Sequence, residues 1–203
     1  TVVACILPWG PASYGFIITS GPDAAGLLLL ESLYNSFVYD FVARSKLSQP
    51  SFPQSTFEQL AALGPESFDG FWMFGESAGG FIQRNTLELT YTAWDLEPFA
   101  KDCGYAGPPF RWDPERRALL RAELDAAFFH LYGLPRDDVD YVMETFPIVK
   151  RHDVEAHGYF RTKNLILARY DAMAQAAATG KPYQTVLDPP PADPRVAHPP
   201  RTS

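Results

Sequence analysis

The chain has 203 residues, of which 46% are hydrophobic and 14% are aromatic, and its formal net charge is −7. This size allows one good hydrophobic core or two small ones, and the composition excludes a disordered chain. The longest apolar run, Ala24 to Leu30, is far shorter than the roughly 20 residues that span a bilayer, so no membrane segment is expected. The acidic balance also excludes a protein that grips nucleic acid by bulk charge alone.

The chain starts at Thr1 without an initiator Met, a basic leader or a small-residue cleavage site, so we interpret Thr1 as a cut through a longer protein. Its two cysteines, Cys5 and Cys103, lie far apart, and neither has a CxxC partner. So few thiols indicate reduced cysteines and a cytoplasmic location.

The first elements are predicted to be strands. Val2 to Leu7 and Tyr14 to Thr19 are β-branched and aromatic runs, separated by a turn-rich loop, which favours a hairpin or adjacent strands. From Pro22 to about Phe41 apolar residues recur at three- and four-residue spacing, which predicts one long helix. This helix would deliver Arg44 to its end.

A loop rich in Pro, Ser and Gln is expected over residues 48–70, with a strand or short helix at Thr56 to Leu63, followed by a short strand at Phe71 to Phe74. The pattern then becomes helical after Gly80 and is expected to stay so until Pro98. Three more helices are predicted, with their signals: Pro114 to Tyr132, capped by Asp113 and stopped by Gly133; Asp137 to Phe146, stopped by Pro147; and Thr162 to Ala178, ended by Gly180.

The proline-dense tail beyond Pro182 is expected to be flexible, because it offers little apolar surface to bury. The predicted fold class is therefore α+β: a small mixed sheet with a long helix on the N-terminal side, then a mainly α-helical region and a disordered tail. The predicted units are residues 1–70, a variable linker at 71–86, a helical region at 87–180 and the tail at 181–203.

The most specific strings lie between Leu87 and Ala174. They are LELTYTAWDLEPFAKDCGYAGPPFRWDPERRALLRAELDAAFFHLYGL, then DDVDYVMETFPIVKR, then FRTKNLILARYDAMA. Closer to the start, SLYNSFVYDFVARSKLSQPSFPQSTFEQL covers Ser32 to Leu60. Together these strings closely resemble the C-terminal part of bacterial restriction-modification methylases, over about 150 of the 203 residues.

In that family one chain carries an adenine-N6 DNA methyltransferase domain followed by a target-recognition region. The resemblance implies that residues 1–70 are part of a target-recognition domain and that the partners are double-stranded DNA and the methylase portion of the parent chain or another defence subunit. It also implies S-adenosylmethionine as the cofactor of the parent protein. The fragment itself is expected to be catalytically inert, with no cofactor or metal of its own.

Cations are unevenly distributed along the chain. Residues 1–83 hold only two, against seven acids, whereas residues 150–181 hold six, against three acids. Arg and Gln on a loop can read guanine and adenine edges, and Lys and Arg contact phosphates. The DNA-binding candidates are Arg44, Lys46, Gln49, Gln54, Lys150, Arg151, Arg161 and Lys163, with Ser55 beside the first group. The alternative is that they form a capped helix end, a polar loop and a basic face that pairs with acids.

A second class of function comes from GESAGG at residues 75–80, which fits the G-x-S-x-G nucleophile elbow of α/β-hydrolase esterases. Ser77 would need an oxyanion-hole loop upstream and a histidine and an acid downstream. No HGGG-like loop precedes it, while His130, His152 and His157 follow it. A glycine-rich surface turn is the favoured interpretation.

Two near matches to the adenine-methylase motif, Gly107 to Phe110 and Asp188 to Pro191, are interpreted as turns, because the first lacks the acceptor and the second lacks the ring. No lysine has an acid two residues before it, so the common metal-dependent nuclease pattern is missing from the sequence. The ligand-rich stretch His152 to His157 does not have zinc-site spacing and is interpreted as a solvated loop. A third possibility is a non-catalytic module whose helices dock onto another protein.

Overall fold

The computed structural model describes residues 2–8, 10, 17–21, 23–47, 53–70 and 75–201. Within this part of the chain the protein is built from helices, and the only extended pairing is an isolated antiparallel bridge between Phe110 and Ala197. The helices are α1 (Ala24–Tyr34), α2 (Phe37–Lys46), α3 (Gln54–Phe57), α4 (Ala78–Thr90), α5 (Glu97–Asp102), α6 (Pro114–Leu131), α7 (Arg136–Glu144), α8 (Pro147–His157) and α9 (Arg161–Thr179). Three short 3-10 turns are η1 (Pro65–Phe68), η2 (Trp94–Leu96) and η3 (Pro194–Val196).

The predicted α+β class is therefore wrong, because the described residues contain no sheet. The first predicted strand is extended but pairs with side chains: Asp40 accepts from the backbone N–H of Val2 at 2.8 Å, and Asn35 bonds both the N–H and the C=O of Ala4. Of the second, residues 17–19 are irregular and the rest lies outside the described residues, as does Phe71 to Phe74. β-branched residues favoured strands, but the residues that the structure describes offer no neighbouring strand with which they could pair.

The long N-terminal helix is split in two. Asn35 ends α1, and its side chain donates to the carbonyl of Glu31. Ser36 begins α2 as its N-cap, with its hydroxyl accepting from the N–H of Tyr39 at 3.3 Å. The apolar spacing continues across this break, which is why periodicity alone predicted one helix.

Two proline signals were misassigned. The helix after Gly80 ends at Thr90, and Pro98 instead lies in the first turn of α5. Pro147 likewise begins α8, so the stretch His152 to His157, predicted to be a loop, is helical. Proline suits the first turn of a helix as well as the end of the one before it.

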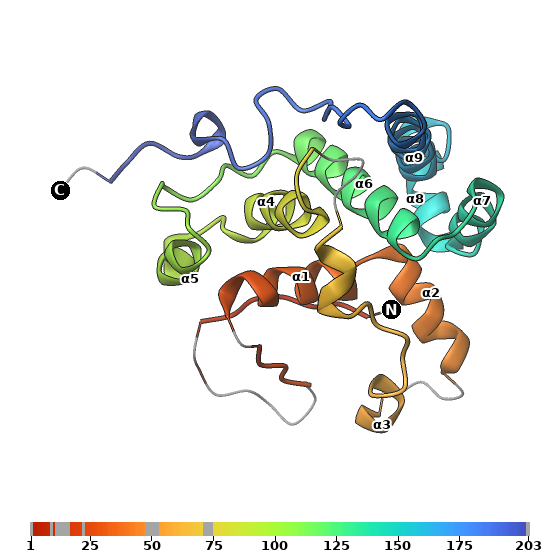
Figure 1. Ribbon diagram of the computed structural model, residues 1–203, viewed down its shortest axis with the longest axis horizontal. Helices are drawn as coiled ribbons and strands as arrows, with labels where there is room; N and C mark the ends of the chain where they lie inside the picture. Colours follow the sequence, from red (N-terminus) through yellow and green to blue (C-terminus); the bar gives the residue numbers. More distant parts are fainter. Residues whose placement is uncertain are drawn as a thin grey trace.

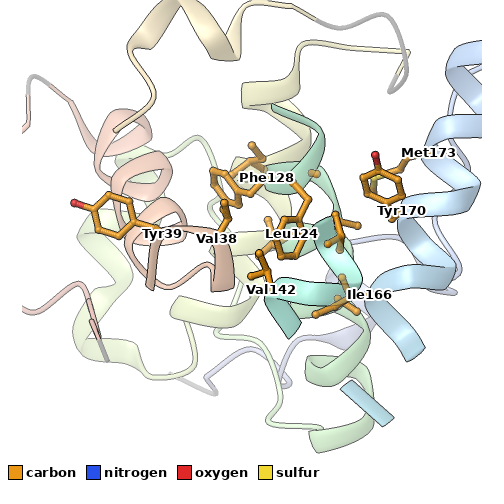
Figure 2. Packing of buried hydrophobic residues seen from close by; sticks show 14 of the residues in the cluster. Val38, Tyr39, Leu124, Phe128, Val142, Ile166, Tyr170 and Met173 are labelled. Atoms are coloured by element: carbon orange, nitrogen blue, oxygen red, sulfur yellow. The ribbon is translucent and has the colours of Figure 1, made fainter. Parts of the chain in front are cut away.

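Helix α6 is the central element and was predicted correctly, with the side chain of Asp113 accepting from the N–H groups of Glu115 and Arg116. It packs against α9 on one side and α4 on another, with α2 also in contact (Figure 1). Figure 2 shows Leu124 and Phe128 of α6 lying between Val38 of α2 and Ile166 of α9. These four side chains are buried and belong to one continuous core.

The expectation of a disordered tail is also wrong for residues 181–201. The segment runs across α4 and α6 (Figure 1) and buries Tyr183, Leu187 and Ala197. Buried Glu123 of α6 accepts hydrogen bonds from the hydroxyls of Tyr183 and Thr185 at 2.8 and 2.7 Å. The tail is ordered by buried polar anchors, and these leave no signature in its proline-rich composition.

Candidate nucleic-acid interface

The structure places Arg44 in the last turn of α2, against the end of α7. Its guanidinium donates to the carbonyl and the hydroxyl of Thr145 at 3.0 and 3.2 Å, and lies 3.9 Å from the ring centroid of Phe146. Asp40, one turn earlier, forms an ion pair with it at 3.3 Å. These contacts occupy the guanidinium in tying α2 to α7, so Arg44 fits the alternative interpretation of a structural helix end better than a base-reading role.

Lys150 and Lys163 meet at one carboxylate. Glu144, the last residue of α7, accepts hydrogen bonds from the ammonium groups of both lysines, and Asp140 lies 3.0 Å from that of Lys163. Hydrogen bonds from Lys150 and Lys163 lower the pKa of Glu144, and the bond to Glu144 raises the pKa of Lys163. The side chain of Lys163 is only 16% exposed, whereas that of Lys150 is 47% exposed.

The two arginines of the second group differ in the same way. Arg161, the first residue of α9, forms a two-point ion pair with Glu115 of α6 and is 18% exposed. Arg151 on α8 is 64% exposed, and its nearest acid, Glu155, lies 3.9 Å away. An exposed pair at that distance adds little stability, so Arg151 is free to exchange this partner for another anion.

The loop candidates are less informative. Gln54 begins α3, and its amide donates to Glu58 at 2.9 Å, while Ser55 is exposed on the same short helix. Gln49 lies outside the described residues. Lys46, the last residue of α2, is exposed and lies two positions beyond Arg44.

The structure thus places one cation of the first group and two of the second at the C-terminal end of α7. Arg44 contacts Thr145, and Lys150 and Lys163 contact Glu144. The candidate cations that remain exposed are Lys46 at the end of α2 and Lys150 and Arg151 in α8, and we call these three the α7-end cations. Glu144 pairs with Lys163 as well as with Lys150, and Glu115 pairs with Arg161. Sequence reasoning missed the pairs with Lys163 and Arg161, because the partners lie 19 and 46 positions apart.

The other predicted chemistry does not assemble among the described residues. Ser77 is the N-cap of α4, and its hydroxyl accepts from the N–H of Gly80 at 3.0 Å. His130 is hydrogen-bonded to the carbonyl of Tyr170 at 3.0 Å, while His152 and His157 lie on α8. Since no sheet is present in the described residues either, Ser77 has the surroundings of a helix cap rather than of a nucleophile elbow.

The ligand-rich stretch from His152 to His157 and the motif from Gly107 to Phe110 also have structural roles in the fold. In the described part of the chain no group of His, Cys, Asp or Glu side chains could hold a metal ion. Asp153, from the ligand-rich stretch, instead accepts from the N–H of Thr162 at 2.6 Å at the start of α9. The ring of Phe110 is fully buried against Tyr91 and Tyr105 and cannot stack on a base.

Comparisons with family models, with curated proteins and with solved structures found no match to this chain. Among the residues that the structure describes, no helix combines the length and the apolar character needed to cross a membrane.

Proposed function

We propose that this chain is the recognition end of a restriction-modification adenine-N6 DNA methylase, and that it positions duplex DNA for the catalytic part of that protein. The strings between Ser32 and Ala174 that resemble this family support the proposal. The structural observation that carries it is the convergence of cations from two sequence-distant groups at the end of α7, with Lys46, Lys150 and Arg151 left exposed.

The contact would be made with phosphates rather than with base edges. Of the side chains that could read bases, Arg44 is held by part-buried hydrogen bonds to Thr145, and Gln54 donates to Glu58 on the surface of α3. Exposed ammonium and guanidinium groups on helix ends suit phosphate oxygens, which fix register without carrying sequence information. This surface would therefore orient the duplex, and sequence would be read elsewhere in the parent protein.

The methyl-transfer chemistry belongs to the rest of the parent. The nearest match to the adenine-binding motif of these methylases, Gly107 to Phe110, has glycine in place of the polar acceptor, its ring is buried, and no glycine-rich cofactor loop accompanies it in the sequence. We assign no step of the reaction to this fragment.

Binding of the purified chain to a random duplex pool, measured by fluorescence anisotropy across a salt series, tests the proposal. Two phosphate contacts from Lys46 and Arg151, or three if Lys150 exchanges Glu144 for a phosphate, predict that the logarithm of the binding constant falls with the logarithm of salt concentration with a slope of about −2 to −3. A folded chain that fails to bind duplex at low salt would contradict it.

Protein docking is the second candidate, because α7, α8 and the turn that follows expose large apolar side chains. Tyr141 and Ile148 are 65% and 61% exposed, and Val154 and Tyr159 are also exposed. Such side chains gathered on adjacent elements are typical of protein contact surfaces. Under this alternative Ile148→Asp would abolish binding to the methylase portion of the parent, while the chain would show no affinity for duplex DNA.

A further inference from the structure

A second cationic surface lies at the bridge between Phe110 and Ala197, away from the residues that sequence analysis selected. The N–H of Arg111 donates to the carbonyl of Val196 at 2.9 Å, and the N–H of His198 donates to the carbonyl of Pro109 at 2.8 Å. The side chain of Arg111 also donates to the carbonyl of Arg195 at 2.8 Å. These bonds place Arg195 of the tail beside Arg111, which precedes α6.

An aromatic ring lies at the edge of this bridge. Trp94 of η2 is half-buried, and the guanidinium of Arg201 lies over it, 4.3 Å from the ring centroid. The two residues line an open hollow of about 680 Å³, together with Asp95, Pro109, His198 and Pro199. The hollow thus combines an indole, an imidazole, a guanidinium and proline rings, which are flat or apolar surfaces on which a planar group can stack.

The surrounding charge favours an anionic ligand. Arg111, Arg195 and Arg201 are all exposed. In the free chain Arg195 is paired with Asp193 at 2.9 Å and Arg111 donates to the carbonyls of Val196 and Arg195, and each would exchange these surface contacts for a phosphate. Asp95 is the acid in the lining, and it can accept hydrogen bonds only, as from the amino group of a base. One accessible aromatic ring flanked by arginines suits a single nucleotide of a single-stranded nucleic acid, with the base stacked on the ring and the neighbouring phosphates neutralised.

We propose that this surface, defined by Trp94, Arg111, Arg195 and Arg201, binds single-stranded nucleic acid. One base stacks on Trp94 in the place that Arg201 occupies in the free chain, and the displaced guanidinium pairs with a phosphate. Arg111 and Arg195 hold the phosphates of neighbouring nucleotides. The proposal is independent of duplex binding at the end of α7, because the two surfaces share no residue.

The test measures binding of the full chain to a fluorescently labelled oligothymidine at low salt, followed by anisotropy. The oligothymidine has about 20 nucleotides, so that it is longer than one such site. Trp94→Leu and Arg201→Ala should each weaken binding, the tryptophan change by about tenfold or more, since stacking is the larger contribution. Trp94→Phe should restore most of the affinity, because it keeps an aromatic face. Arg136→Ala, which removes an exposed cation on α7, is the matched charge control and should bind as the unaltered chain does.

Two outcomes would overturn the proposal: a folded chain that does not bind oligothymidine, or a Trp94→Leu variant that is folded by circular dichroism and binds as tightly as the original. Lys46→Ala with Arg151→Ala keeps the two proposals apart. That double variant should lose duplex affinity and keep its affinity for oligothymidine. Loss of both in this variant would also contradict the assignment, since binding would then follow net charge alone.

Discussion

Arg44 and Thr145 join two helices that lie 101 positions apart in the sequence, through two hydrogen bonds from one guanidinium. The same group stacks on Phe146, which packs in turn against Phe37 with ring centroids 4.6 Å apart. A side chain selected from the sequence as a base reader is therefore part of the structural joint between α2 and α7.

Arg44→Ala should lower the free energy of unfolding by roughly 1–3 kcal/mol, because it leaves the carbonyl of Thr145 without its donor and removes packing on Phe146. Urea denaturation measures the change. Lys46→Ala is the control, since an exposed side chain should change stability by less than about 0.5 kcal/mol. Equal free energies of unfolding for the two variants would show that the Arg44 contacts do not stabilise the packing of α2 against α7.

The buried carboxyl group of Asp125 should make the stability of the fold depend on pH. Burial raises its pKa from 3.8 to about 7, against the hydrogen bond from the N–H of Phe37 and the charge of Arg121. Between about pH 4 and 7 the folded chain holds a proton that the unfolded chain has released, so stability falls as pH rises through this window. Burial raises the pKa of Glu31 to about 7 as well, which adds to the same trend.

Asp125→Asn keeps the acceptor for Phe37 and removes the titration. It should therefore stabilise the chain at pH 8 by up to roughly 4 kcal/mol and change it little at pH 4. Denaturation of both chains at the two pH values measures the difference. The same stability difference at both values would show that Asp125 does not titrate in this window.

The tail depends on Glu123. Tyr183→Phe removes one of the hydrogen bonds that this buried carboxylate accepts, and should cost roughly 1–3 kcal/mol. Hydrogen exchange over residues 183–197 should accelerate, because the tail loses an anchor. Lys181→Ala, at an exposed position just before the segment, is the control. Rapid exchange of the tail in the unaltered chain would instead revive the expectation of a flexible terminus.

Ser77→Ala should lower the free energy of unfolding by about 1 kcal/mol, which is the usual loss when a helix N-cap is removed. The unaltered chain should not react with a fluorophosphonate probe, since no histidine is seen bonded to Ser77 among the described residues. Labelling at Ser77 would establish the esterase alternative.

Local signals predicted α6, α7 and α9 but missed α8. Asp113 and Gly133 bracket α6, and Gly180 ends α9 in a left-handed conformation. Caps and periodicity are properties of neighbouring residues, which is why the sequence reveals them. The predicted strand at Val2 to Leu7 failed for the opposite reason. Whether an extended run joins a sheet depends on a partner strand, and Asn35 and Asp40 serve as its partner here.

The candidate site could be predicted only in part. Charge runs identified Lys150 and Arg151, but nothing local shows that Glu144 neutralises Lys163 or that Glu115 neutralises Arg161. The stacking of Arg201 on Trp94 likewise joins residues that are distant in sequence. Only the fold shows which cations are available to a ligand.

Comparison of duplex binding by two double variants tests the proposed phosphate contacts most directly. Lys46→Ala with Arg151→Ala removes two of the α7-end cations, and Lys101→Ala with Arg136→Ala removes two exposed cations elsewhere with the same change in net charge. We predict that the first pair of substitutions lowers affinity and makes the salt slope shallower by about 1 to 2, while the second pair leaves the slope unchanged. Equal losses from both pairs would contradict a defined phosphate-binding surface at the end of α7.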